Sequence, residues 1–513
     1  MRIGIDVGGT NTDAVLMDGR KVKGATKTPT TPNVTDGIVK ALRDLVQQTQ
    51  LDTQKIQAVM LGTTHFTNAV VERRHLAPTA AIRICLPATS ALPPMVDWPQ
   101  DLRASLGNHY FLVHGGHEYD GREIAPFDAS EVRQAADSIA ALGIKAVAIS
   151  SVFSPINGEF EERTAEIVRE VIPDANITLS SAIGRLGLLE RENAAIINAC
   201  LCGVAERTVA AFESALSQLN IKAPFFLSQN DGTLMSSSFA QKYPVLTFAS
   251  GPTNSMRGAA FLSGLKDALV IDVGGTTSDI GMLQNGFPRV ASQAVDIGGV
   301  RTNFRMPDVY SFGLGGGSSV KNDPLMVGPQ SVGYELQTRA LIFGGDTLTT
   351  TDIVVAGGFQ SIGDPARVSH LDKDLIRRVL DRIEEMVNIS VDRMKTSATP
   401  IPVVAVGGGS ILIVRPISGA SEIVTPEHYA VANAIGAAIA QVGGEVDRVF
   451  SLAAMSREQA LEEAKAEAIS KAVSAGADAS TVEIVDVEEV PLAYLPGNAT
   501  RIAIKAVGDL AMA

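Results

Sequence analysis

The sequence predicts an α/β protein in which one strand–turn–strand unit occurs twice. Residues 3–19 read IGIDVGGTNTDAVLMDG, and residues 269–286 read LVIDVGGTTSDIGMLQNG. IDVGGT is identical in the two copies, which lie about half of the 513 residues apart. Patterns typical of alternating strands and helices fill the space between them. A long-range repeat and this alternation together predict a duplicated, layered α/β fold.

Each copy has the features of a hairpin whose tip can bind an anion. Ile3 to Val7 is a short apolar run typical of a buried strand, and strand character resumes at Ala14. Gly8 and Gly9 lack a Cβ and so permit a tight turn that exposes a concave set of N–H groups suited to a phosphate. A single copy is explained equally well as an ordinary hairpin. Two copies predict two hairpins that hold one polyphosphate from two sides.

The composition is that of an ordinary water-soluble protein. Hydrophobic residues make up 45% and charged residues 19%, and the formal net charge is −13. Nucleic-acid binding is not expected, because it requires a basic surface. Three cysteines form no disulfide framework and fit a reducing compartment. The N-terminal residues show no signal-peptide pattern, and no apolar run of membrane length stands out, so we expect a cytoplasmic protein without a membrane segment.

The first half alternates strands with helices. The pattern predicts strands at 21–28, 56–61, 80–86, 146–150 and 177–180, and helices at 35–48, 129–142 and 158–171. A long helix at 188–219 crosses toward the second half. The Gly62-Thr63-Thr64 stretch follows the strand at 56–61, and its hydroxyls fit a ligand site or a helix cap.

The second half predicts the same architecture with an insertion. Residues 246–252 predict a strand that turns into a helix at 254–262, and further elements are predicted at 372–396, 401–406 and 426–442. The tail predicts a helix at 457–475 and strands at 481–488 and 500–507. We expect three units, namely 1–190, 191–445 with a Gly/Thr-rich insertion at about 287–370, and a small α+β module at 446–513. The insertion fits a ligand-facing lid as well as an ordinary loop.

Two clusters contain residue types that bind metals, but neither is predicted to bind a metal ion. His114, His117 and Glu118 do not have a standard zinc spacing, and the glycines between the histidines indicate a loop. Cys200 and Cys202 are two positions apart and so face different sides of a helix. We expect them to be buried structural thiols.

The order of the glycine-rich motifs carries a resemblance. The two hairpins, the strand that ends in Ala405-Val406-Gly407-Gly408-Gly409-Ser410 and the helix after it resemble the superfamily of sugar kinases, actin and heat-shock chaperone ATPases. A narrower set of motifs is similar to the hydantoinase A/5-oxoprolinase family. These motifs are DVGGT at 6–10, GTT at 62–64 with TNA at 67–69, ER at 190–191 with NA at 198–199, SGP at 250–252, DVGGTT at 272–277, GGGS at 315–318 and LTTTD at 348–352.

The resemblance implies a duplicated actin-like ATPase fold, with two ribonuclease H-like domains around a nucleotide cleft and a small α+β C-terminal module. It implies ATP and Mg²⁺ as cofactors. Asp6 and Asp272 are the expected catalytic and metal-binding residues, although both could instead only cap hairpin turns. The expected nucleotide-binding residues are Gly8, Gly9, Thr10, Asn11, Thr12, Gly274, Gly275, Thr276, Thr277, Gly315, Gly316, Gly407, Gly408, Gly409 and Ser410.

The sequence departs from the longer members of that family. Its tail is compact, Asn11 replaces the usual aromatic residue, and residues 193–195 replace hydroxyl residues in the crossing helix. These departures affect the expected identity of the substrate more than the expected ATP chemistry.

The resemblance implies an ATP-dependent hydrolase that opens a cyclic amide, such as a hydantoin, 5-oxoproline or a lactam, by phosphorylating the amide oxygen. The expected partners are that small substrate and a second hydantoinase-type subunit or a homo-oligomer. A small-molecule kinase or a subunit of an ATP-dependent ketone carboxylase is the first alternative. A non-catalytic nucleotide-switch protein is the second.

Overall fold

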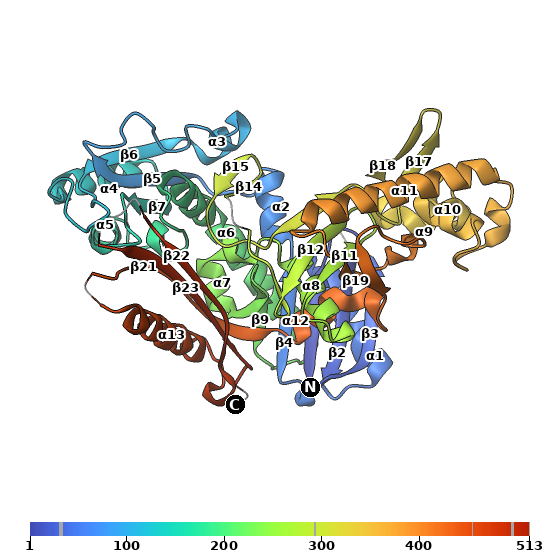
Figure 1. Ribbon diagram of the computed structural model, residues 1–513. Coiled ribbons are helices and arrows are strands. Elements are labelled where there is room, and N and C mark those ends of the chain that lie inside the picture. Colours follow the sequence, from blue (N-terminus) through green and yellow to red (C-terminus); the bar gives the residue numbers. More distant parts are fainter. Residues whose placement is uncertain (30–33, 292–293, 454, 494–496, 512–513) are drawn as a thin grey trace.

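Two mixed β-sheets with the same core strand order lie at the centre of the fold (Figure 1). The computed structural model describes residues 1–513 except 30–33, 292–293, 454, 494–496 and 512–513. In the first sheet, β1 pairs antiparallel with β2 and parallel with β4, and β2 pairs antiparallel with β3. Six strands of this sheet are β1 (Arg2–Val7), β2 (Asn11–Asp18), β3 (Lys21–Pro29), β4 (Ala58–Thr63), β9 (Phe225–Ser228) and β10 (Thr233–Ser236).

The second sheet repeats this arrangement and confirms the predicted duplication. β11 pairs antiparallel with β12 and parallel with β19, and β12 pairs antiparallel with β13. The fifth position is filled by a parallel strand in both sheets, β9 in the first and β20 in the second. The strands of the second sheet are β11 (Ala268–Val273), β12 (Ser278–Gln284), β13 (Phe287–Pro288), β16 (Val309–Phe312), β19 (Ile401–Val406) and β20 (Ala420–Val424). This is the duplicated α/β fold expected from the sequence.

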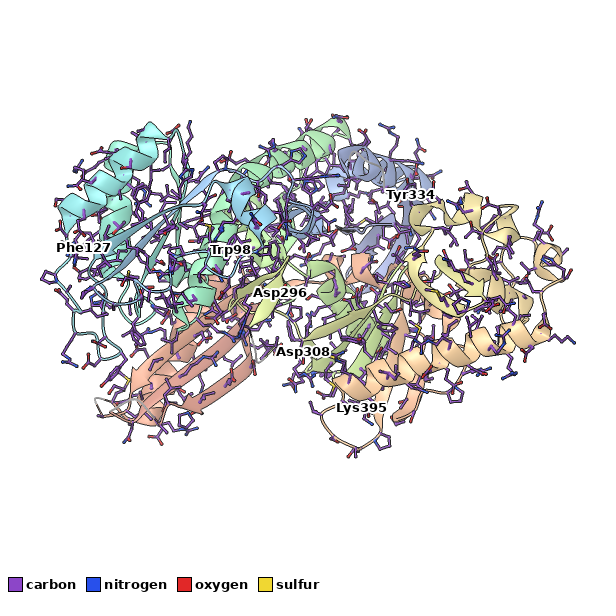
Figure 2. The ribbon with its side chains drawn as sticks, turned by 90° about the horizontal axis from the view of Figure 1, so that it is seen from above. Trp98, Phe127, Asp296, Asp308, Tyr334 and Lys395 are labelled. Carbon is purple, nitrogen blue, oxygen red and sulfur yellow. The ribbon has the colours of Figure 1, made fainter. Side chains whose placement is uncertain are left out.

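A third, fully parallel sheet branches from the first half, in the order β6-β5-β7-β8. Phe127 and Trp98 lie on this side of the molecule when it is seen from above, and Tyr334 lies toward the opposite end (Figure 2). The strands of this third sheet are β5 (Thr79–Leu86), β6 (His109–His114), β7 (Ala146–Ser151) and β8 (Asn176–Leu179). The helices of the first half are α1 (Val34–Thr49), α2 (His65–Val71), α3 (Gln100–Leu106), α4 (Ala129–Ala141) and α5 (Glu159–Val171).

The long crossing helix α6 (Leu188–Gln218) is a core element. By length and composition α6 could cross a membrane, and it is the one helix among the described residues that is long and apolar enough to do so. This corrects the expectation that no apolar segment reaches the length of a membrane span. In the structure 72% of its apolar window is buried. Cys200 and Cys202 are free and buried within it, as predicted. The helix therefore supplies apolar surface to the interior, where it packs on β7 and β8.

Helices α8 (Ser250–Ser263) and α12 (Ala432–Ala438) pack tightly on each other at the centre of the fold. A Cβ on Gly436 would lie 1.8 Å from the Asn254 carbonyl oxygen, and a Cβ on Gly258 would lie 1.9 Å from that of Ala432. Only glycine permits such a close approach of two helix backbones. On the other side of α12, a Cβ on Gly4 of β1 would meet the Ala434 carbonyl oxygen. These glycines bring both helices next to β1.

Two predictions about this region were wrong. Residues 244–247 form a short 3₁₀ helix rather than the predicted strand, and α8 begins at Ser250. The helix predicted at 426–442 is α12, which begins only at Ala432 and ends at Ala438. Residues 441–451 form the strand β21, because Val442, Val446 and Phe450 alternate into the core between the sheet and α13.

The insertion carries its own small elements beside the second sheet. The hairpin β17–β18 lies at its outer end, near α11 (Figure 1). The elements of the insertion are β14 (Val295–Ile297), β15 (Val300–Thr302), β17 (Ser318–Asn322), β18 (Leu325–Ser331), α9 (Leu336–Arg339) and α10 (Thr350–Ala356). Helix α11 (Lys373–Met394) follows the insertion, and the short helix α7 (Ser237–Lys242) precedes the second sheet.

The C-terminal strands extend the first sheet. β21 (Gln441–Ser451) pairs parallel with β10 and antiparallel with β23 (Ala499–Gly508), which pairs with β22 (Glu483–Pro491). Helix α13 (Arg457–Ser474) covers one face with a row of buried alanines. The predicted module is thus continuous with the first sheet in its strand pairing, and the proposed boundaries at 190 and 445 stay predictions.

Candidate functional site

The duplicated hairpins place the two aspartates in equivalent positions. In the first hairpin Asp6 lies opposite Asp13, and in the second Asp272 lies opposite Asp279. Each turn is closed in the same way, since Gly8 N donates to the Asn11 carbonyl at 3.0 Å and Gly274 N donates to that of Thr277 at 2.9 Å. The sequence identity therefore extends to the geometry of the turns.

The tips of the two hairpins face each other. A Cβ added to Gly275 would lie 2.9 Å from Cγ2 of Thr10. Glycine is needed here because a side chain would push the two tips apart. The structure thus brings together two predicted phosphate-binding turns that are distant in sequence.

One helix binds both aspartates. Asn254 Nδ2 of α8 lies 3.3 Å from Asp6 Oδ1, and Ser255 Oγ lies 2.5 Å from Asp272 Oδ2. From α12, Asn433 Nδ2 donates to Asp6 Oδ2 at 3.0 Å. Gly62 provides the space for the first of these contacts, since a Cβ there would lie 2.3 Å from Asp6 Oδ1. The sequence reasoning missed all three donors, because none belongs to a motif with a spacing that points at an aspartate.

The carboxylates at this site are poorly compensated in charge. Burial, together with the neighbouring carboxylates of Asp13 and Asp272, raises the pKa of Asp6 to about 6 against the opposing hydrogen bonds from Asn254 and Asn433. Desolvation also raises the pKa of Asp272, although the Ser255 hydrogen bond and Lys27 oppose the shift. Lys27 binds both oxygens of Asp13 at 2.7 Å. The site therefore holds more negative charge than one lysine balances.

Asp279 adds to this negative charge. Desolvation raises its pKa to about 6, and the Asp272 carboxylate contributes to the increase, while a hydrogen bond from Ser311 opposes it. Together, the four aspartates form a site that favours a positively charged ligand.

The segment Gly315–Gly317 holds the second hairpin from behind. Gly316 N donates to the Gly274 carbonyl at 3.0 Å, and Gly317 N donates to that of Gly275 at 2.7 Å. Because a trans peptide directs its C=O and N–H to opposite sides, the N–H groups of Gly275 and Thr276 point away from this segment. Thr350 anchors the segment through the carbonyls of Gly315 and Gly316. A contact of these two glycines with nucleotide stays a prediction.

The turn at residues 407–410 lies against Asp272. Gly407 has φ +84°, and a Cβ there would lie 2.1 Å from Asp272 Oδ1. Gly409 N donates to the Val273 carbonyl at 2.7 Å. The Ser410 hydroxyl is buried and has no hydrogen-bond partner among the described residues. This turn thus joins the second hairpin and leaves one polar group to be satisfied.

The described residues contain no group of three or more His, Cys, Asp or Glu side chains that could hold a metal by themselves. His114 is paired with Glu131, since its Nδ1 lies 2.9 Å from the Glu131 carboxylate. His117 is buried against Phe160, with ring centroids 4.3 Å apart, and burial lowers its pKa. Each of these two rings therefore contacts a neighbouring side chain of the fold.

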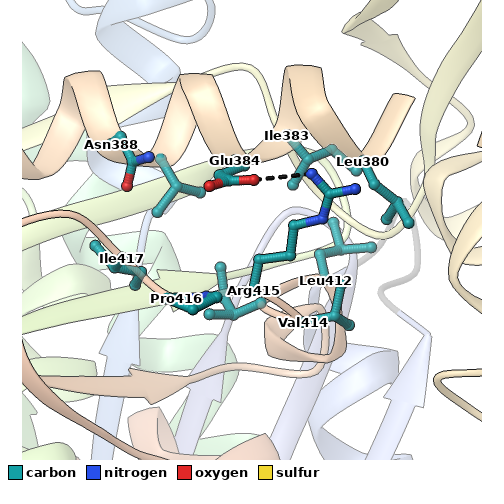
Figure 3. A pocket seen from close by; sticks show the side chains of 11 residues that line it. Leu380, Ile383, Glu384, Asn388, Leu412, Val414, Arg415, Pro416 and Ile417 are labelled. Carbon is teal, nitrogen blue, oxygen red and sulfur yellow. Dashed lines mark hydrogen bonds and ion pairs between the residues drawn. The ribbon is translucent and has the colours of Figure 1, made fainter. Parts of the chain in front are cut away.

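A cavity beside α11 is too small for a substrate. Figure 3 shows it between the helix and residues 412–417, with Arg415 paired to Glu384 across it. Its volume is about 10 Å³, the space of a single water molecule. This cavity is therefore not a substrate site.

Comparisons with known protein families cover most of the chain. A family described as Hydantoinase/oxoprolinase N-terminal region matches residues 2–172, and one described as Hydantoinase/oxoprolinase matches residues 191–399.

Curated relatives are about one quarter identical. Caprolactamase subunit alpha from Pseudomonas jessenii is 26% identical over 433 residues, covering 76% of this chain and 60% of the relative. Acetophenone carboxylase gamma subunit from Aromatoleum aromaticum is 27% identical, covering 70% and 53%, and 5-oxoprolinase 1 from Arabidopsis thaliana is 25% identical, covering 82% and 37%. The chain thus spans about three fifths or less of the length of these relatives.

Two solved structures share the whole fold. The crystal structure of ATP-dependent caprolactamase from Pseudomonas jessenii superimposes with a TM-score of 0.77 at 19% identity. Nucleotide-free acetone carboxylase gives a TM-score of 0.69 at 18% identity. Each match covers 100% of this chain and 88% of the other.

Proposed function

Because this chain belongs to the hydantoinase/oxoprolinase family, we propose that it is an ATP-dependent hydrolase that opens a small cyclic amide. The observation that carries this proposal is the pair of facing glycine turns, with an aspartate behind each and one helix bound to both. Such an arrangement suits phosphoryl transfer, which depends on positioning and on charge neutralisation.

The turns supply the phosphate contacts in this proposal. The N–H groups at the tips of the turns, at residues 9–10 and 275–276, bind the phosphate oxygens from two sides, because Gly8 N and Gly274 N already donate within their turns. The threonine hydroxyls add further donors. The turn at 407–410 borders the adenosine, where the unpartnered Ser410 hydroxyl can form a hydrogen bond.

The donor set fits Mg²⁺. Asp6 and Asp272 are oxygen ligands whose raised pKa values reflect uncompensated charge, which a divalent cation relieves. Because the described residues offer no third carboxylate at metal-binding distance, water would complete the shell, as Mg²⁺ usually prefers. When bound, the cation would neutralise the negative charge that gathers on the phosphates.

The chemistry follows from the weakness of an amide as an electrophile. The amide oxygen attacks the γ-phosphorus, the bond to ADP breaks, and a phosphorylated amide forms. Water then attacks the activated carbon, the C–N bond breaks and the nitrogen takes a proton, which leaves an acyl phosphate. A second water hydrolyses the acyl phosphate to the ring-opened acid and inorganic phosphate. Asp6 or Asp272 orients the attacking group, and the glycine turns hold the phosphates in line.

A partner subunit belongs to the proposal. Caprolactamase subunit alpha and acetophenone carboxylase gamma subunit are both named as subunits, and both are longer than this chain. We therefore propose that the reaction requires a second hydantoinase-type subunit or a further copy of this chain.

Similarity to two carboxylase subunits supports a second candidate, a subunit of an ATP-dependent ketone carboxylase. Both candidates use ATP to activate a carbonyl oxygen, so they share the hairpin site.

A substrate screen tests the proposal. ATP hydrolysis is measured with hydantoin, 5-oxoproline, lactams and, with bicarbonate, acetone or acetophenone, in the presence of co-purified partner proteins. Stimulation by a cyclic amide with formation of the ring-opened acid supports the hydrolase. Stimulation only by a ketone with bicarbonate assigns the carboxylase, and no ATP binding overturns both.

A further inference from the structure

A second region of the molecule has the properties of a small-molecule site. A cavity of about 360 Å³ lies where the start of α6, the segment around the β14–β15 hairpin and the C-terminal strands meet. Its polar lining includes Arg185, Glu190 and Asp447, and Val449 and Val490 are among its apolar walls. This volume lies within the range of ordinary ligand pockets.

The wall that carries Glu190 is held rigidly. The next residue, Arg191, is fully buried and donates to the Leu186 carbonyl at 2.7 Å and to Ser180 Oγ at 2.9 Å. Glu192 is also buried and forms an ion pair with Arg83. Because these two neighbours fix the first turn of α6, Glu190 is presented to the cavity in a defined place.

The Glu190 carboxylate has free hydrogen-bonding capacity. Among the described residues its one ion pair is with Arg301 at 3.9 Å, which is beyond hydrogen-bond distance. Gly187 keeps the adjacent space open, since a Cβ there would lie 3.0 Å from Glu190 Oε2. An acceptor of this kind at a cavity wall suits an N–H donor.

A cation lies on the same wall. Arg185 Nε is 3.3 Å from Asp447 Oδ2 and forms no hydrogen bond in the described part of the chain. Asp447 is already bound at both oxygens by Arg501, at 2.7 and 2.6 Å. The guanidinium of Arg185 therefore has an N–H group left to donate to a ligand.

Three arginines (Arg185, Arg448 and Arg501) and two acids (Glu190 and Asp447) line the cavity. Arg501 is paired with Asp447, and Arg448 is paired with Glu463 and Glu467. Arg185 and Glu190 are left as one cation and one anion, which together suit an uncharged ligand that both accepts and donates hydrogen bonds.

We propose that this cavity binds an uncharged cyclic amide. In a ring the amide is cis, so its C=O and N–H lie on one edge. The carbonyl accepts a hydrogen bond from Arg185, the N–H donates to Glu190, and the apolar walls cover the ring methylenes. The choice of an amide rests on the proposed function, whereas the cavity and its donor–acceptor pair stand apart from it.

Binding of δ-valerolactam to the nucleotide-free chain tests this assignment by titration calorimetry. Glu190→Leu removes the acceptor, and Val490→Trp fills the cavity without changing a charge. Each is expected to weaken binding of the lactam by about tenfold or more, because a hydrogen bond to a charged group or the space for the ring is lost. Glu162→Leu is the matched control, since it also removes an acid from the first turn of a helix but is exposed on α5.

The outcomes separate this site from the proposed ATP chemistry. Thermal melting of each variant first establishes that it is folded. Wild-type chain that binds Mg-ATP but not the lactam, or folded variants that bind the lactam as the wild type does, would overturn the cavity assignment alone. Wild-type chain that binds the lactam with loss in both cavity variants, but binds no ATP, supports the cavity and rejects the proposed function.

Discussion

Asn254 and Ser255 are adjacent on α8, yet they donate hydrogen bonds to the aspartates of different hairpins. Asn254 lies 3.3 Å from Asp6 and Ser255 lies 2.5 Å from Asp272. Consecutive helical residues differ by about 100° in direction, so one helix can reach two separate strands only where it passes between them. The helix therefore links the two halves directly at the site, and a movement of either hairpin must be accommodated by α8.

Asp6→Asn and Asp272→Asn are predicted to abolish most substrate-dependent ATP hydrolysis. Each change keeps the size of the side chain but removes a charge that would hold a cation or orient a nucleophile, so a loss on the order of 10²-fold is expected. ATP binding should weaken less, since the backbone contacts of the turns survive. Steady-state turnover beside calorimetric titration of ATP measures both. Folded variants with wild-type turnover would show that the aspartates only cap the turns.

The stability of the nucleotide-free protein is predicted to depend on the ionisation of Asp6. Its pKa is about 6 in the native state and 3.8 ordinarily, so the native state binds this proton more tightly than the unfolded chain does. The contribution of this group to stability is greatest below pH 3.8 and is lost as the pH rises through 6. At 1.36 kcal/mol per unit, the loss is about 3 kcal/mol.

Asp6→Asn isolates this contribution. The free energy of unfolding of the variant, minus that of the wild type, should increase between pH 4.5 and pH 7.5, because only the wild type loses the favourable proton. Denaturant titrations without metal or nucleotide measure it. A difference that stays constant over this range would contradict the assigned pKa.

Asn254→Ala and Ser255→Ala are predicted to shift the acid limb of the pH–rate profile to higher pH. Each removes a hydrogen bond that lowers the pKa of an aspartate, so the ionised form is reached only at higher pH. Ser263→Ala is the control on the same helix, since that hydroxyl donates only to the Ala259 carbonyl of α8. An equal shift of the acid limb in the control would mean that the shift comes from general damage to α8 and not from the lost hydrogen bonds.

Gly407→Ala is predicted to lower both stability and turnover, while Gly408→Ala leaves stability nearly unchanged. At Gly407 the backbone is left-handed and a Cβ would collide with Asp272 Oδ1, so strain and displacement of the aspartate are both expected. At Gly408 the nearest atom to a Cβ is Cε of Lys27 at 3.9 Å. Denaturant unfolding of the two variants makes the comparison, and equal stability would refute the steric argument.

The fold was largely predictable because its strongest signals are local. The strands at 80–86 and 401–406 and the helix at 372–396 follow from runs and periodicities within a few residues, and the structure has them within two residues. The prediction failed at 246–252, a short apolar run that resembles a strand, and at 426–442, a run rich in small residues with little periodicity. The close packing of α8 on α12 at Gly258 and Gly436 is a long-range contact that neither run encodes.

The sequence by itself determined the duplicated hairpins and the equivalence of Asp6 and Asp272, because both follow from a repeated string of adjacent residues. Only the tertiary structure decided which groups contact them. Asn254 is 248 positions and Asn433 is 427 positions from Asp6, and no local spacing encodes such a pair. Likewise, the pairing of β21 with β10 joins strands about 200 residues apart, a register that backbone hydrogen bonds and burial fix only when the whole chain is folded.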